Sequence, residues 1–195
     1  MLKTIFQNYT PKNEQETIDR TTILAFIDNN PDALERTNTI AHITASAIVI
    51  NDEATHVLFA HHNIYNSWAW VGGHADGNPD LLEVALKETR EETGLKDVAP
   101  VYKDPFMVDI LQVTNHIKHG RYVGDHLHLN ATYLLRGDAT APLSVKPDEN
   151  SGVRWFTLDE ALTRVSEPRM IPVYQKAFDA IREMTRDDFA YRRFN

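Results

Sequence analysis

The sequence contains no cysteine among its 195 residues, and basic residues are in the minority. The absence of cysteine excludes disulfide bonds and all thiolate chemistry, whether catalytic or metal-binding. The 20 Lys and Arg residues are outnumbered by 28 Asp and Glu, which gives a net charge of −8. Because broad binding to a nucleic-acid backbone requires a surface rich in Lys and Arg, nucleic acid is not an expected partner. A small phosphorylated substrate is compatible with this charge if a bound cation supplies local positive charge.

Long hydrophobic runs are also missing. No stretch approaches the length of a membrane span, and residues 1–15 lack the apolar run of a signal peptide. We therefore expect no membrane partner and a cytoplasmic location. A chain of this length is long enough for one domain with a hydrophobic core and short for two, so we predict a single domain over residues 1–195.

The hydrophobic pattern changes its period along the chain. Helical spacing predicts a helix over 13–36 with a break at residues 29–31, and a C-terminal amphipathic helix from about Met170 to Met184. Thr157 and Glu160 form the capping pattern of another short helix. Alternation predicts strands over 40–50, 55–60, 106–113 and 126–135, with a loop or hairpin end over 114–124. The order of elements predicts an α/β fold, in which a mixed sheet lies between helices in α/β/α layers.

A glycine-rich segment over 72–80 is followed by a predicted helix over 81–95. We expect Asn78 to be its N-cap, with Pro79 in the first turn and Gly94 as a left-handed C-cap. Glycines in the approach to a helix let backbone groups come close to an ion or a phosphate.

Three glutamates near the end of that helix, Glu88, Glu91 and Glu92, are spaced to lie on one face. Crowded carboxylates repel one another, which costs stability unless a cation lies between them. Carboxylate oxygens suit Mg²⁺ or Mn²⁺, so the pattern predicts a divalent-metal site that acts on phosphates. The alternative is a solvated acidic face neutralised by Lys87 and Arg90. The preceding glycines favour the metal site, because a plain surface helix has no need of them.

At residues 73–95 the chain resembles the signature of the Nudix hydrolase superfamily, Gx5Ex7REUxEExGU, where U is aliphatic. The residues that match without a gap are Gly73, Glu88, Glu91, Glu92, Gly94 and Leu95. Three positions depart from the signature, since Pro79 replaces its first glutamate, Lys87 its arginine and Thr89 an aliphatic residue. Segments 62–73 and 151–156 also look like parts of the family, so the resemblance covers about residues 40–165. The Nudix fold is an α/β/α sandwich, and the helices at both ends of this chain are expected additions to it.

The resemblance implies hydrolysis of a diphosphate linkage in a nucleoside diphosphate-X type substrate, by attack of water on phosphorus. It implies Mg²⁺ or Mn²⁺ held by Glu88, Glu91 and Glu92, with a backbone carbonyl at Gly72 or Gly73 as a further ligand. One of these glutamates, or an acid outside the motif, accepts the proton from water. Glu149 is the outside candidate and Asp148 its alternate, and a solvent-facing loop acid is an equally good interpretation.

Other side chains are candidates for substrate contact. His74 lies inside the glycine loop, while His126 and His128 share one face of a predicted strand. A polar strand face with hydrogen-bonded histidines is the plainer explanation for that pair, and we expect substrate contact rather than metal binding from it. Trp70 precedes the glycines, where an aromatic ring stacks on a base or packs in the core. His42 and His56 are expected on the surface of strands.

Two rival functions follow from the same resemblance. The departures at Pro79 and Lys87 suit a nucleotide-binding module that has lost catalysis, whereas the retained acidic trio argues against it. An isomerase branch of the family uses a cysteine, which this chain lacks. The expected partner is a small-molecule diphosphate of unknown attached group. The oligomeric state is open, although homodimers are common in the family.

Overall fold

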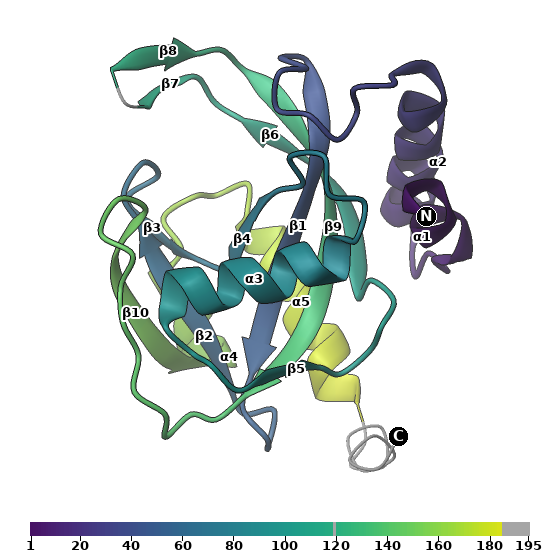
Figure 1. Ribbon diagram of the computed structural model, residues 1–195. Helices are drawn as coiled ribbons and strands as arrows, with labels where there is room; N and C mark the ends of the chain where they lie inside the picture. Colours follow the sequence, from purple (N-terminus) through teal and green to yellow (C-terminus); the bar gives the residue numbers. More distant parts are fainter. Residues whose placement is uncertain (119, 185–195) are drawn as a thin grey trace. The chain divides into compact units, whose positions relative to one another are not determined.

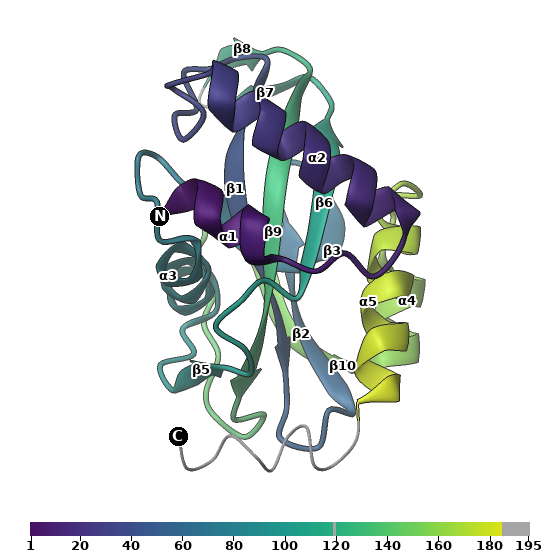
Figure 2. The same cartoon turned by 90° about the vertical axis from the view of Figure 1, so that its right-hand side faces the viewer.

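The computed structural model describes residues 1–118 and 120–184 (Figures 1 and 2). The chain divides into two compact units. The first contains residues 1–47, 72–88 and 102–133, and the second contains residues 48–71, 89–101 and 134 onward. Within the described ranges, no helix combines the length and the apolar character needed to cross a membrane. The prediction of a single domain stays a prediction.

Two helices open the first unit, α1 (Leu2–Asn8) and α2 (Glu14–Asn29). The two helices lie side by side, and α2 packs against strand β6 (Met107–Val113) (Figure 2). The buried carboxylate of Glu16 joins them, because it accepts from the Tyr9 hydroxyl at 2.6 Å and from the Lys12 amide at 2.8 Å. The side chain of Asn13 caps α2 by accepting from the amide of Glu16.

The predicted helix over 13–36 is confirmed as far as Asn29, as is the predicted break at residues 29–31, and the helical prediction is wrong for the residues after the break. Asn30 leaves the helical region at φ −129°, and residues 31–34 form turns. Pro31 explains the end, because it has no amide hydrogen and disfavours helical backbone at the residue before it. Helix α1 was not predicted from the sequence.

The sheet of the first unit contains strand β1 (Ala41–Ile50) as far as Ala47, with β4 (Val71–His74) and β9 (His126–Gly137) as its neighbours. Strand β6 pairs antiparallel with β9, so that Val113 lies opposite His126. Strands β7 (His116–Lys118) and β8 (Arg121–Val123) form a separate hairpin (Figure 1). The predicted strands over 40–50, 106–113 and 126–135 are therefore present, and 114–124 contains the expected hairpin end.

The strands of the second unit pair mainly with β2 (His56–His62). Strand β2 pairs antiparallel with the end of β1, with β3 (Ser67–Ala69) and with β10 (Asn150–Thr157). Strand β5 (Val98–Pro100), which the sequence did not reveal, pairs with the end of β9. The turn between β1 and β2 is held by the Asn51 side chain, which accepts from the amides of Thr55 and His56.

Helices α4 (Leu158–Arg164) and α5 (Ile171–Glu183) complete the second unit and confirm both predictions for this region. Thr157 caps α4 by accepting from the Glu160 amide at 3.2 Å. The apolar face of α5 buries Tyr174, Ala177, Phe178 and Ile181. Tyr174 lies against Phe59 of β2 with ring centroids 4.9 Å apart, which attaches α5 to the sheet of this unit.

Helix α3 (Leu81–Thr93) carries the acidic motif and contributes residues to both units. Its N-cap lies two residues later than expected, because Asp80 rather than Asn78 accepts from the Glu83 amide at 3.1 Å. Asn78 instead accepts from the amide of Asp80 at 2.9 Å, and Pro79 therefore precedes the helix. The prediction of Asn78 as N-cap is thus wrong. Gly94 has φ +71° and ends the helix as predicted.

The capping role of Asp80 predicts that Asp80→Ala lowers the free energy of unfolding by about 1 kcal/mol, because one amide of the first turn loses its acceptor. Asp80→Asn is the matched control and should retain most of the stability, since its side-chain oxygen still accepts. Chemical denaturation of the three proteins measures the difference. Equal stability of Asp80→Ala and wild type would contradict the assignment.

Candidate functional site

The glycine loop and the motif helix approach each other closely in the first unit. A Cβ added at Gly73 would lie 2.6 Å from Cδ and 2.8 Å from Oε1 of Glu88. Gly72 is equally confined, because its Cβ would meet the carbonyl oxygen of Ala45 on β1 at 2.6 Å. A side chain at Gly73 would displace the Glu88 carboxylate, and one at Gly72 would collide with the backbone of β1.

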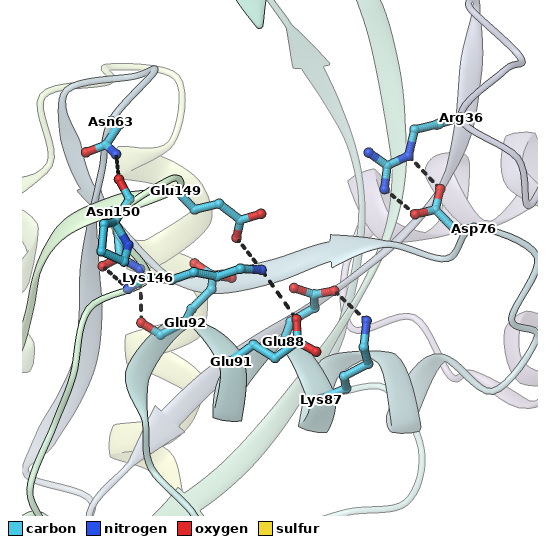
Figure 3. A network of polar contacts seen from close by, with 11 residues as sticks. Arg36, Asn63, Asp76, Lys87, Glu88, Glu91, Glu92, Lys146, Glu149 and Asn150 are labelled. Atoms are coloured by element: carbon cyan, nitrogen blue, oxygen red, sulfur yellow. Dashed lines mark hydrogen bonds and ion pairs between the residues drawn. The ribbon is translucent and has the colours of Figure 1, made fainter. Parts of the chain in front are cut away.

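The second unit places further carboxylates around a lysine. Lys146 Nζ lies 3.3 Å from Glu91 Oε2 and 3.2 Å from Glu149 Oε2, and Figure 3 shows it reaching between these two side chains. Glu92 is 4% exposed, and one of its carboxylate oxygens lies within 4.8 Å of one from Glu149. Glu149, predicted from its region of the sequence, is therefore close to a motif glutamate.

The turn that carries Lys146 and Glu149 is anchored at both ends. The amides of Glu149 and Asn150 donate to the carbonyl of Lys146 at 2.8 Å. Asn150 donates through Nδ2 to the backbone carbonyl of Glu92 at 2.9 Å, which ties this turn to the end of α3. Asn63 also holds this turn. Its Nδ2 donates to the Pro147 carbonyl (Figure 3), and its backbone amide donates to the Glu149 carbonyl.

The three departures from the Nudix signature have definite surroundings. Lys87 lies 3.6 Å from Glu88 Oε1, so it keeps a charge contact but lacks the planar fork of arginine. Thr89 is fully buried at its aliphatic position and accepts through its carbonyl from the Thr93 hydroxyl. Pro79 lies outside the helix, so the chain has no glutamate at the first glutamate position of the signature.

Trp70 lies against α5 rather than in open solvent. Its ring meets that of Tyr174 edge-on at 5.2 Å, and its amide donates to the Tyr174 hydroxyl at 3.2 Å. The ring is nonetheless only half-buried. This contact gives Trp70 a packing role, and stacking on a substrate stays a prediction.

The predicted substrate histidines form a cluster in the first unit that contains a fourth member. The rings of His74, His126 and His128 surround His42, with centroids 4.9 to 5.0 Å from its ring. His42 was expected on a strand surface, and this prediction is wrong, because the residue is 3% exposed. All ten residues of β1 are buried, so alternation could not identify an exposed face.

Burial lowers the pKa of His42, His74 and His128 and thereby favours their neutral forms. It lowers the pKa of His74 to about 3, with the charge of Arg36 as the next cause. It lowers the pKa of His128 to about 2, and the neighbouring histidines add to the effect. A cationic contact with a substrate phosphate is therefore not expected from His74 or His128. The Arg36 charge is itself matched by Asp76, which accepts from its guanidinium at 2.6 Å (Figure 3).

Lys146 is the residue of this region that sequence reasoning missed. It lies in a loop with no periodicity and belongs to no part of the signature. Only its position three residues before Glu149 hinted at a pairing.

Comparisons with known proteins agree with the motif. The family model of the NUDIX domain matches residues 41–177. No curated protein sequence gives a significant match. A Caenorhabditis elegans Ap4A hydrolase complex has 15% identity and a TM-score of 0.54, covering 73% of this chain and 98% of its own.

Two bacterial structures are similar to a comparable extent. A NUDIX-family hydrolase from Clostridium perfringens has 17% identity and a TM-score of 0.52, covering 72% of this chain and 97% of its own. The E. coli dihydroneopterin triphosphate pyrophosphohydrolase has 11% identity and a TM-score of 0.52, covering 71% and 95%. These likenesses confirm the predicted α/β fold with its mixed sheet, while the family model covers most of the chain. The protein therefore belongs to the Nudix hydrolase family.

Proposed function

We propose that this protein hydrolyses a diphosphate linkage in a nucleoside diphosphate-X type substrate with the help of Mg²⁺ or Mn²⁺. The observation that carries the proposal is the burial of Glu92 beside a second carboxylate, that of Glu149. Like charges at low exposure repel each other, and a cation that joins them removes the cost. The donors are hard oxygens, which fit these two ions better than softer metals.

The ligand set we propose is Glu88, Glu91 and Glu92 with the backbone carbonyl of Gly73. The three glutamates lie within four residues of one another on α3, and Gly73 contacts Glu88. When bound, the metal would polarise phosphate oxygens and lower the pKa of a coordinated water. The role of the chain is then to hold these carboxylates in place, since phosphoryl transfer depends on positioning and electrostatics.

Glu149 is the proposed acceptor of the proton from water. Its carboxylate is about one-third exposed and lies close to that of Glu92. Lys146 holds Glu149 in a charge contact at 3.2 Å, which fixes the position of the carboxylate. Asp148 remains the alternate from the same turn.

The substrate is proposed only as a class. The similar structures carry the names of an Ap4A hydrolase and of a dihydroneopterin triphosphate pyrophosphohydrolase, so one fold accompanies different attached groups. We propose Trp70 and the neutral imidazole of His74 as substrate contacts, because Trp70 precedes the glycine loop and His74 lies inside it. A cytoplasmic location, a single functional domain and a homodimer belong to the same proposal.

A nucleotide-binding module without catalysis is the second candidate. It is favoured by Lys87, which contacts Glu88 through one charge where arginine would offer two hydrogen bonds. Incubation with a panel of diphosphate substrates separates the two functions. Metal-dependent release of phosphate or of a nucleoside monophosphate supports the enzyme, whereas binding without release supports the module.

Glu92→Gln should lower Mg²⁺-dependent turnover by at least about 100-fold, because the loss of a ligand exceeds the effect of losing an outer-shell partner. Glu83→Gln is the matched control, since Glu83 is an exposed acid on the same helix that contacts Asn78. Phosphate release measures both, and circular dichroism checks the fold. Wild-type turnover in Glu92→Gln would remove the assignment.

Gly73→Ala should lower turnover on the order of 100-fold while changing stability by less than about 1 kcal/mol. The new methyl group meets the flexible end of Glu88, which moves aside at little cost but leaves its ligand position. Gly124→Ala is the control, because a Cβ there would meet no atom of the described residues within 4 Å. Unchanged turnover in Gly73→Ala, or equal losses in both variants, would contradict the role of this close approach.

Lys146→Met should raise the affinity for Mn²⁺ in the absence of substrate. The ammonium competes with a cation for Glu91 and Glu149, and its removal is worth about 1 kcal/mol, or about fivefold. Electron paramagnetic resonance of free Mn²⁺ measures the change, with exposed Lys96→Met as the charge-matched control. Weaker binding by Lys146→Met would show that the lysine supports the cation site instead.

A further inference from the structure

Four histidines from three strands meet in the first unit, among residues that the acidic motif does not use. His42 lies on β1, His74 on β4, and His126 and His128 on β9. One ring nitrogen from each of His42, His74 and His128 lies within 4.8 Å of the other two. Strands β4 and β9 both neighbour β1, so neighbouring backbones of the sheet hold the three rings together.

His42 points an unsatisfied nitrogen into this cluster. Its Nδ1 lies 3.0 Å from the carbonyl oxygen of Asn38, and a carbonyl can only accept, so Nδ1 carries the proton. Nε2 then holds a lone pair, yet it is buried and has no hydrogen-bond partner among residues 1–118 and 120–184. A buried polar atom without a partner costs stability, and such an atom needs an explanation. A ligand that accepts the lone pair supplies one.

The surrounding hydrogen bonds match those of metal-binding histidines. Such a histidine usually donates its second ring N–H to a carbonyl or carboxylate, which fixes the tautomer and the ring orientation. His42 does so to Asn38, and His126 Nδ1 lies 2.8 Å from the carbonyl of Gly124. His126 Nε2 lies 3.2 Å from Nε2 of His128, so His126 orients its neighbour.

We propose that His42, His74 and His128 form a binding site for a divalent transition metal ion of the zinc type, with His126 as a positioning residue. Three imidazoles leave one position of a tetrahedral ion open. Ligand nitrogens around zinc lie about 3.3 Å apart, so small rotations of rings already within 4.8 Å of one another close the site. Imidazole nitrogen selects zinc, nickel or copper over Mg²⁺, which prefers oxygen.

The nearby charges permit a cation. Arg36 and Lys118 are the positive groups that act on His74, and Asp76 is the negative one. Arg36 is engaged by Asp76 through two guanidinium contacts, so the pair contributes little net charge. This site shares His74 with the proposed substrate contacts but uses none of the proposed catalytic glutamates, so zinc binding and hydrolysis can each fail without the other.

The test is a Zn²⁺ titration of the full-length protein, stripped of metal with a chelator, in competition with a chromogenic zinc indicator. It is performed on the wild type and on Glu92→Gln, which removes a carboxylate from the acidic residues of α3. We expect one Zn²⁺ per chain in both proteins. Co²⁺ substitution should give the intense visible absorption of a tetrahedral site with nitrogen ligands.

His42→Gln and His74→Gln should each weaken Zn²⁺ binding by more than about 100-fold, because each removes a ligand. His74→Gln keeps the test valid if the buried His42 is needed for folding, and circular dichroism identifies folded variants. His56→Gln, on β2 of the second unit, is the matched control and should bind as the wild type. Zinc binding that survives in folded His74→Gln but is lost in Glu92→Gln overturns the proposal. So does the absence of Zn²⁺ binding by the folded wild-type protein.

Discussion

Repulsion between carboxylates at low exposure is the constraint on which the proposed site depends. Glu92 is 4% exposed and lies close to Glu149, and such a pair is costly unless positive charge compensates it. The chain supplies part of this charge through Lys146, which contacts Glu91 and Glu149. In the proposed function, a divalent ion would displace this flexible lysine side chain from the two acids.

Backbone groups position charged side chains within each unit. Gly72 lies against the backbone of β1, and Gly73 against the carboxyl group of Glu88. Asn150 fixes the turn of Lys146 and Glu149 to the end of α3 through the carbonyl of Glu92. These contacts involve glycines and a hydrogen bond to the backbone, so the charged side chains are positioned by the backbone itself.

Much of the fold could be predicted because several elements have strong local signals. Thr157 and Gly94 cap their helices as expected, since these residue types satisfy free amides or adopt positive φ. The N-cap of α3 was misplaced because Asn78, Pro79 and Asp80 are all residues that favour a helix N-terminus, and propensity alone does not choose among them. Strand β5 has only three residues and depends on its pairing with β9, so no local period marks it.

The sequence by itself determined the family, the acidic trio on one helix and the glycines before it, because spacing along a helix is a local property. Only the tertiary structure decided that Lys146 meets Glu149 and Glu91, and that His42 is buried among three other histidines. The contact of Lys146 with Glu91 and the histidine cluster join segments far apart in the chain. They arise from strand pairing and from the packing of loops, which leave no fixed interval between the residues involved.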